Sequence, residues 1–462
     1  MKLKSISLRH AHHFSDLKIE FKYSKKPVTL ILGDHGAGKT AILKNIYQSL
    51  TWFPARFKDV RTAGVVMPDT DIMLNRVQSR IDVHVKVPEE IGPLPESTTA
   101  ESTDVSICSW RLYKTIHANG TGYSKVDTQQ LEQTVELYHK AMAQDPLIGL
   151  PMIAYFPSDR FVSDINLISK NNPAVFQNHS AYELVALPYT TFARFFEWFR
   201  EICDIENAQS AQLLEQILQE SEHSTSNDEN KNIEFSRTLF QAHAKVHNPS
   251  LNALKTAIQT VIPEITDIYL EYQPKLQLMV TYQGEKILYT QLSNSMKNWV
   301  ALVGDLVRRL CLLNVKSLFP CLEGQGILLI DNIDAQLDQS TTQNILYRLN
   351  QAFPNVQIIA SGVSDDLLEH ADDYQYFKLE QKALHEIQLS SSKRSMDSIY
   401  QGLLGEDYSV SPEPLKEPMQ ELSPVDKLLE DFQHLNEEQQ SLLLRLIQGD
   451  DNTTTDQITP ST

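Results

Sequence analysis

Cysteine is scarce in this chain, and the few thiols are widely spaced. The 462 residues include four cysteines, at positions 108, 203, 311 and 321, and none of them forms a CxxC pair. So few thiols exclude a disulfide framework for a chain of this length. The sequence therefore predicts a protein of a reducing compartment, and we expect a cytoplasmic location.

Long apolar runs are also missing. No stretch of about 18 apolar residues occurs anywhere, and the N-terminal MKLKSISLRH alternates apolar and polar residues. A signal peptide would have a continuous apolar core at this place. Secretion and membrane spanning are therefore not expected.

Positive charge is in short supply as well. The chain has 41 Lys plus Arg against 59 Asp plus Glu, which gives a net charge of −18. This imbalance disfavours non-specific attraction to nucleic acid or to anionic membranes, so any DNA contact is expected to be local or made by a partner. Because 41% of the residues are apolar, the chain can build a large core. A disordered or fibrous protein is thus excluded.

What the sequence does contain is a pattern of short strands and helices. Residues 3–21 alternate at period two and predict two half-buried strands. Residues 28–32 form an apolar run typical of a buried parallel strand, and helical spacing begins just after it, at Ala41. Two further strands, at 80–87 and 105–113, are expected to form an antiparallel edge sheet.

The rest of the chain divides into a structured part and a tail. We expect strands at 152–156, 276–281, 285–289, 326–330 and 356–360, helices at 251–261 and 298–313, and an aromatic core helix at 192–203. The polar stretch 220–232 predicts a surface loop or disorder. Beyond about residue 390, acidic residues and prolines indicate a linker. Within that linker, the apolar residues of 425–447 recur at the spacing of an amphipathic helix. Docking of this helix on a partner and packing on the chain's own core are expected equally.

A phosphate-binding pattern lies between the apolar strand and the first helix. Residues 33–40, GDHGAGKT, fit G-x-x-x-x-G-K-[ST]. In this pattern, backbone N–H groups of the turn and of the helix N-terminus hold phosphate oxygens. The predicted cradle consists of Gly33, Asp34, His35, Gly36, Ala37, Gly38, Lys39, Thr40 and Ala41. Lys39 would reach the β and γ phosphates and Thr40 would bind Mg²⁺, so ATP is the expected ligand.

A second nucleotide-binding element follows much later in the chain. Residues 326–331, GILLID, form an apolar strand that ends in Asp331. Its carboxylate is predicted to hold Mg²⁺, mostly through a metal-bound water. The long insertion between the two elements lacks sustained heptads, which excludes long coiled-coil arms.

With both elements present, the chain resembles ABC-type ATPases of the RecF/SMC-like group, in particular the bacterial ATPases that include the PtuA subunit of Septu and retron-associated anti-phage systems. The matching stretches run from the start through GDHGAGKTAILKNIY, from IAYFPSDR to FARFFEWFREICDIEN, and from QLSNSMKNWVALVGDLVRRL through GILLIDNID to FPNVQIIASGVSD. The resemblance implies an α/β fold, an ABC-type P-loop ATPase head with a mainly helical insertion and an acidic C-terminal tail. It places the head at 1–160 and 271–390, the insertion at 161–270, and the linker with the C-terminal helical segment at 391–462.

Three positions depart from the family's active site. In such ATPases, an LSGGQ-like signature of one head contacts the γ phosphate held by the other; here Ser293 matches the signature serine, but Ser295 replaces its closely approaching glycine. Asn332 replaces the carboxylate that polarises the attacking water, and Val363 replaces the switch histidine. Loss of a general base commonly lowers the rate about 10²-fold to 10⁴-fold. We therefore expect ATP binding with weak or absent hydrolysis, and assign no catalytic residue.

The resemblance also implies partners. Head-to-head dimers or higher oligomers are expected to hold or restrain an HNH-type effector nuclease in anti-phage defence. The alternative is a working RecF-like or SMC-like ATPase that clamps DNA during repair. That alternative requires another side chain, such as Asp334 or Asp338, to replace the missing carboxylate.

Three smaller features each have two interpretations. The cluster His10, His12 and His13 suggests a metal site, but we favour a turn between strands. Arg160 either touches a phosphate or links the head to the insertion, and a surface ion pair is slightly favoured over both. At the end of the aromatic helix, helix capping is favoured over metal binding for Asp204, Glu206 and Asn207.

Overall fold

A computed structural model of the chain describes residues 1–23, 25–94, 106–117, 120, 122–162, 181–182, 192–222, 249–370 and 373–387. The chain divides into two units, Met1–Ser391 and Ser392–Thr462, and everything below concerns the first. The predicted helical segment 425–447 and most of the predicted loop at 220–232 lie outside the described residues. The four-part division of the chain stays a prediction.

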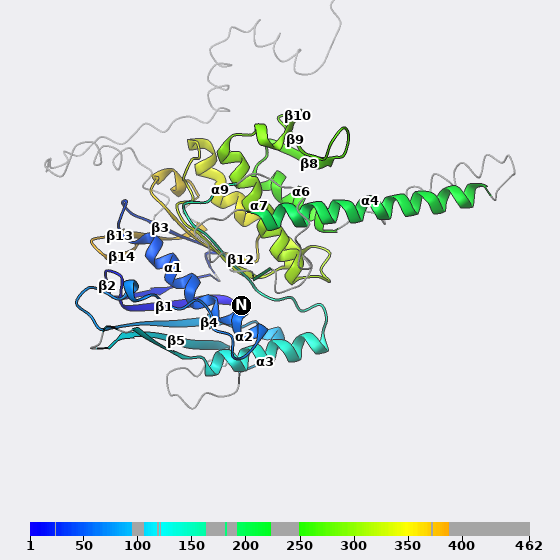
Figure 1. Cartoon of the computed structure of the whole chain (residues 1–462). Coiled ribbons are helices and arrows are strands. Elements are labelled where there is room, and N and C mark those ends of the chain that lie inside the picture. The colour runs from blue at the N-terminus through cyan, green and yellow to red at the C-terminus, as the bar shows by residue number, and fades with distance from the viewer. Residues whose placement is uncertain are drawn as a thin grey trace, which may run out of the picture. The chain divides into compact units, whose positions relative to one another are not determined.

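A mostly parallel six-stranded sheet lies at the centre of the first unit (Figure 1), in the order β14-β13-β3-β12-β11-β7. Its strands are β3 (Val28–Leu32), β7 (Met152–Phe156), β11 (Gly326–Ile330), β12 (Val356–Gly362), β13 (Tyr374–Glu380) and β14 (Ala383–Ile387). β14 pairs antiparallel to β13, and the other pairings are parallel. Every residue of β3, β11 and β12 is buried, which confirms the buried parallel strands expected from the apolar runs.

An antiparallel five-stranded sheet lies beside the parallel one, in the order β2-β1-β4-β5-β6. Its strands are β1 (Lys2–Ala11), β2 (Phe14–Glu20), β4 (Gln78–Lys86), β5 (Ile107–Ile116) and β6 (Gly122–Asp127). The predicted N-terminal strands and the pairing of β4 with β5 are confirmed. The N-terminal strands belong to the same sheet, because β1 pairs with the other side of β4.

The helices pack on both sheets (Figure 1). They are α1 (Lys39–Leu50), α2 (Trp52–Lys58), α3 (Gln129–Gln144), α4 (Ala193–Glu222), α6 (Pro249–Val261), α7 (Asn294–Leu313), α8 (Pro320–Glu323) and α9 (Gln339–Ala352). Helix α1 is in contact with each of the two sheets, and α3 lies on the antiparallel one. A small antiparallel sheet is made by β8 (Ile265–Glu271), β9 (Gln277–Tyr282) and β10 (Glu285–Leu288). The last two strands are the hairpin predicted from the sequence. None of the helices in the described ranges is long and apolar enough to cross a membrane.

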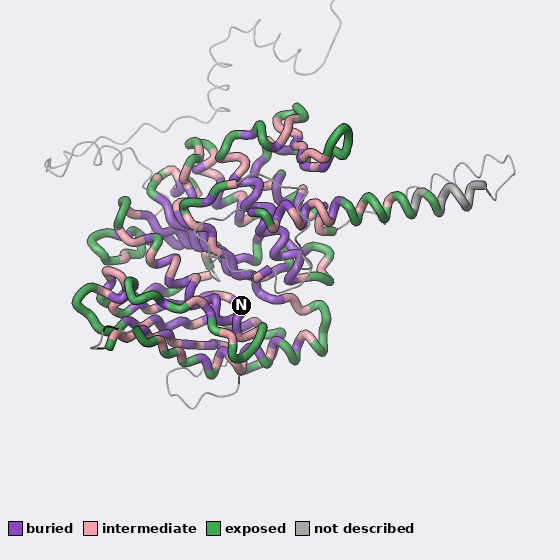
Figure 2. Tube along the Cα trace, in the orientation of Figure 1, coloured by how far each residue is buried: buried purple, intermediate pink, exposed green. Residues whose placement is uncertain are grey.

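The aromatic start of α4 is a core element, as its sequence predicts. Phe195, Trp198 and Phe199 are buried there, and Gly304 of α7 lies so close that a Cβ would overlap the Phe195 ring. Beyond this contact α4 leaves the core, and Figure 2 shows exposed residues along it.

The helix-capping interpretation for the acidic residues of α4 is wrong. Asp204, Glu206 and Asn207 lie within the helix, which continues to Glu222. The Tyr272 hydroxyl donates to Asp204 Oδ1 at 2.7 Å, and Asn207 Nδ2 donates to the Tyr272 oxygen at 3.1 Å. These side chains therefore attach the loop after β8 to the surface of α4.

Candidate nucleotide-binding site

The phosphate-binding loop joins β3 to α1 at the carboxyl edge of the parallel sheet. Gly36 and Gly38 have φ values of 78° and 112°, a region that favours glycine. Gly38 is the N-cap residue of α1 and supplies no side-chain cap, so the first N–H groups of the helix remain available to a ligand. A pocket of about 350 Å³ lies over this loop. It is lined by His12, His35, Gly36, Ala37, Gly38, Lys39, Thr40, Ala41, Lys44 and Asn332.

Gly38 is required by its neighbours in the protein as well as by the turn. A Cβ at this position would overlap the His13 ring and lie 2.8 Å from Phe14. His13 Nε2 forms a hydrogen bond of 2.9 Å with the Ala37 carbonyl oxygen. His12 and His13 occupy the turn between β1 and β2, which confirms that interpretation for these two residues, whereas His10 lies within β1. Sequence reasoning missed that this turn packs on the cradle.

Lys39 lies within the cradle and is buried, since only 5% of the residue is exposed. Its ammonium donates to the carbonyl oxygens of Gly33 and Asp34, the second at 2.9 Å. Burial lowers the pKa of Lys39, and the opposing charges of Asp331, Asp334 and Asp34 act to raise it. The lysine is thus positioned beside the amides that would hold phosphate oxygens.

Thr40 and Asp331 meet, as the sequence predicts. The Thr40 hydroxyl donates to Asp331 Oδ2 at 2.7 Å, and the Ser361 hydroxyl donates to Oδ1 at 2.5 Å. Asp331 has no exposed surface. A hydroxyl and a carboxylate are the hard oxygen donors that Mg²⁺ prefers, and Mg²⁺ keeps several waters, so this pair fits a nucleotide-bound Mg²⁺. Sequence reasoning missed Ser361, although a polar residue near the end of the buried run of β12 was a usable signal.

Asn332 follows Asp331 and lines the cradle pocket. Its φ is 43°, and its N–H donates to Ser361 Oγ at 3.0 Å. The side chain is a neutral amide and cannot accept a proton from water. The position beside the predicted phosphates therefore carries no general base.

The two acidic residues considered as substitutes have other partners. Asp334 Oδ2 accepts the backbone N–H groups of Val363 and Ser364, both at 2.7 Å. Asp338 is the N-cap residue of α9 and accepts the Thr341 N–H at 2.7 Å. Neither carboxylate lines the cradle pocket. Both act on backbone groups in this structure.

A family model described as an AAA domain matches residues 5–266, more than half of the chain. The chain belongs to the AAA domain family. Membership implies nucleotide binding, in agreement with the cradle.

The chain is similar to two curated relatives over most of their length. The chain is 25% identical to the Retron Ec83 probable ATPase of Escherichia coli over 401 residues, covering 80% of this chain and 70% of that protein. It is 28% identical to the Retron Vc95 probable ATPase of Vibrio cholerae serotype O1 biovar El Tor over 383 residues, covering 78% and 70%. Among solved structures, the Smc head domain bound to the C-terminal domain of ScpA, derived from Pyrococcus furiosus, is 13% identical with a TM-score of 0.44. That match covers 87% of this chain and 99% of the Smc chain.

Arg160 links strand ends inside the AAA domain, so the predicted surface ion pair is wrong. The residue is 7% exposed. Its guanidinium donates to the carbonyl oxygens of Asp331 at 2.6 Å and Asn332 at 2.9 Å, and to that of Pro157 at 3.0 Å. Burial lowers the pKa of Arg160 to about 10, while the charges of Asp331 and Asp334 act in the other direction. Arg160 therefore fixes the backbone where β11 ends and Asp331 follows.

Ser293 lies apart from the cradle pocket of the AAA domain. It is the N-cap residue of α7 and accepts the Met296 N–H at 3.2 Å. With Ser295, Gln336 and Asp338, it lines a separate pocket of about 200 Å³. Contact between Ser293 and a nucleotide held by a second head stays a prediction.

Proposed function

We propose that this AAA domain binds ATP with Mg²⁺ and hydrolyses it slowly or not at all, as a subunit of an anti-phage defence complex that restrains a separate effector nuclease. The observation that carries the first part is the combination of a complete phosphate cradle with Asn332 at the position of the general base. ATP then acts as a conformational ligand, because its unequal affinity for open and closed assemblies sets their ratio.

The binding half of the proposal is supported by the arrangement of charge around the loop. Lys39 and Lys44 line the pocket together with the first turn of α1. A helix N-terminus and two ammonium groups favour a polyanion. The Thr40 and Asp331 oxygens would hold the Mg²⁺ that accompanies ATP, and the metal would neutralise charge between the β and γ phosphates.

The defence half rests on the relatives. Both curated relatives are named as retron probable ATPases, and the resemblance to anti-phage ATPases implies a nuclease partner of the HNH type. On this proposal the chain keeps that nuclease inactive while ATP is bound. Loss of ATP during infection would release it.

The deciding experiment identifies the nucleotide that the protein carries. The full chain is purified without added nucleotide and denatured, and the released nucleotide is separated by chromatography. We expect intact ATP in roughly equimolar amount from wild type, none from Lys39→Ala, and wild-type ATP from Lys58→Ala, which removes an exposed lysine outside the pocket. Bound ADP, or ATP consumed during incubation, would contradict the non-hydrolysing proposal and favour an active DNA-clamping ATPase.

A second experiment tests the partner. The chain is coexpressed with an HNH-type nuclease encoded beside it, and cell growth is measured. Wild type should protect the cells, whereas Lys39→Ala should leave the nuclease toxic at equal protein levels. Equal protection by both variants would contradict control by ATP.

A further inference from the structure

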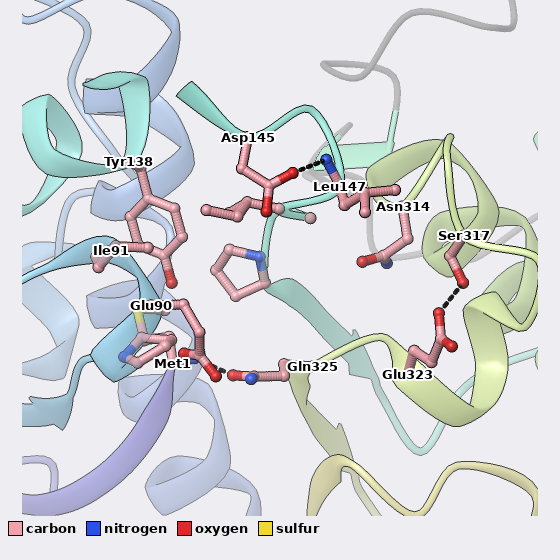
Figure 3. Close-up of a pocket in the computed structure, with 14 residues that line it drawn as sticks. Met1, Glu90, Ile91, Tyr138, Asp145, Leu147, Asn314, Ser317, Glu323 and Gln325 are labelled. Atoms are coloured by element: carbon pink, nitrogen blue, oxygen red, sulfur yellow. Dashed lines mark hydrogen bonds between the residues drawn. The ribbon is translucent and has the colours of Figure 1, made fainter. Parts of the chain in front are cut away.

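A second pocket lies at the opposite end of the strands that carry the nucleotide site. Gln325, which lines it, immediately precedes β11, and Asp331 immediately follows that strand. A five-residue strand spans roughly 17 Å, so the two sites are separate. The pocket has a volume of about 220 Å³. Figure 3 shows it between the region of Glu90, Tyr138 and Asp145 and the region of Asn314, Ser317 and Glu323.

The lining of this pocket is acidic. Glu90, Asp145 and Glu323 contribute carboxylates, and no Lys or Arg occurs among the described residues that line it. Asp145 accepts the Leu147 N–H at 2.9 Å, and Glu323 accepts the Ser317 hydroxyl at 2.5 Å. Each of these carboxylates still has lone pairs for a further donor.

Two buried polar groups also face the pocket. Tyr138 is 1% exposed, and its hydroxyl has no hydrogen-bond partner among the described residues; Figure 3 shows it directed toward Glu90. The amine of Met1, a residue also 1% exposed, donates to Gln325 Oε1 at 2.8 Å. Burial and Lys2 lower the pKa of this amine to about 4, against the opposing effect of Glu90. The Tyr138 hydroxyl, which lines the pocket, is therefore available to a group that enters it.

An apolar rim adjoins the acidic pocket. Leu147 is 71% exposed, and the segment after α7 exposes further large apolar side chains. That segment contributes Val315 (64%), Leu318 (68%), Phe319 (58%) and Leu322 (50%). The two parts of the rim are joined, because the Leu150 N–H donates to the Leu313 carbonyl oxygen at 3.0 Å, and Gly149 lies so close to Asn314 that a Cβ would overlap its amide. Apolar side chains gathered in this way on a surface mark an interaction site.

We propose that this pocket receives a lysine or arginine side chain of a partner protein, whose neighbouring apolar residues pack on the rim. Charge complementarity selects the basic group, since a cation meets three acidic side chains and no competing Lys or Arg among the described lining residues. The Tyr138 oxygen accepts a hydrogen bond from the same group. The rim selects a protein segment over a free cation, because a small cation would leave the apolar side chains in water.

The proposal is tested by selecting peptides from a random display library on the full chain. Wild type should enrich peptides with a basic residue flanked by apolar residues. The selected peptide is then synthesised, and its Kd is measured by fluorescence anisotropy. The double variant Glu90→Gln/Glu323→Gln should raise this Kd at least tenfold, and Tyr138→Phe, which keeps the ring, about threefold. The control Glu136→Gln, an exposed acidic residue of α3 outside the pocket, should leave it unchanged.

The rim is tested separately with Leu318→Ser/Phe319→Ser against the control Leu74→Ser, which alters a leucine 84% exposed elsewhere. The rim variant should raise the Kd at least fivefold, and the control should not. Spermidine and n-propylguanidinium serve as free cations. Enrichment of peptides without a basic residue, or equal binding by the Glu90→Gln/Glu323→Gln variant, would overturn the proposal. So would free cations that bind as tightly as the peptide and are insensitive to the rim variant. Circular dichroism of each variant checks that it is folded.

Discussion

The two ends of β11 carry opposite chemistry. At the carboxyl end, Lys39 and Lys44 line a pocket that suits an anion, and both oxygens of Asp331 accept hydroxyl groups. At the amino end, the pocket is acidic, and the Tyr138 hydroxyl has no partner among the described residues. A net charge of −18 describes neither site. The comparison shows that the side chains which the fold brings together at each end, and not the average composition, decide which ligand a site favours.

The ends also differ in how completely their polar groups are bonded within the chain. Arg160 and Asp334 bind backbone groups at the carboxyl end. Glu90 at the amino end is exposed and has no such bond in the described structure. Substitutions should therefore affect stability strongly at the first end and weakly at the second.

The largest effect is expected in the phosphate-binding loop. Gly38→Ala should lower the free energy of unfolding by about 4 kcal/mol, because it combines a positive φ with overlap of His13. Gly36→Ala is the matched control; its Cβ would meet nothing within 4 Å, so only the backbone term of about 1 kcal/mol remains. Urea unfolding measures both values. Equal losses would show that the turn conformation alone fixes these glycines.

Arg160→Ala should lower the free energy of unfolding by about 3 kcal/mol, since it leaves buried carbonyl oxygens without donors. At the other end, Glu90→Gln should change it by less than about 0.5 kcal/mol, as is usual at the surface. The same urea experiment compares them. If the loss for Glu90→Gln matched that for Arg160→Ala, the contrast between the two ends would be refuted.

Restoring the missing carboxylate should increase turnover. Asn332→Glu is expected to raise ATP hydrolysis at least about tenfold, as a positioned general base contributes 10²-fold to 10⁴-fold and the φ of 43° offsets part of the gain. Phosphate release measures the rate. Asn332→Gln, which keeps the amide, should show no increase. An unchanged rate in Asn332→Glu would locate the defect elsewhere in the site.

A further effect concerns pH and the Met1 amine. Its pKa is lowered from 8.0 to about 4, so between these pH values the unfolded chain binds more protons than the folded chain. With respect to this group, the free energy of unfolding is therefore highest above about pH 8. It falls as the pH is lowered toward 4, by at most about 1.4 kcal/mol per pH unit.

The measurement is the free energy of unfolding at pH 5, 6 and 7. A chain extended by two residues before Met1 carries its free amine at a different place and serves as the control. Its stability should depend less steeply on pH. Identical slopes would indicate that the amine does not titrate as its burial predicts.

Much of the fold could be predicted because its signals are local. The apolar runs of β3 and β11 and the glycine-rich loop between β3 and α1 are continuous in sequence, and each predicts its own structure. The meeting of Thr40 and Asp331 was also predictable, since both follow strands of one parallel sheet. α7 begins at Asn294, four residues before the start at 298 that its apolar spacing indicates, because Ser293 caps the helix.

Other residues could not be assigned because their partners come from distant segments. The buried Arg160 donates to the carbonyl oxygens of residues 331 and 332, which are far from it in sequence. Asp204 lies within a helix whose end the sequence did not mark. His13 contacts the cradle only because β1 and β2 place their turn on it. In each case the local sequence does not specify the partner of the residue.

The sequence by itself determined that this chain carries a phosphate cradle, an aspartate after a second apolar strand, and an amide in place of the usual general base, since these features depend on residue type and short-range spacing. Only the tertiary structure decided that the His13 turn packs on the cradle, that Arg160 is an internal link, and that an acidic pocket with an apolar rim lies at the amino end of β11. These features arise where segments distant in sequence are brought together, and their energies depend on burial and on partners that no local pattern specifies.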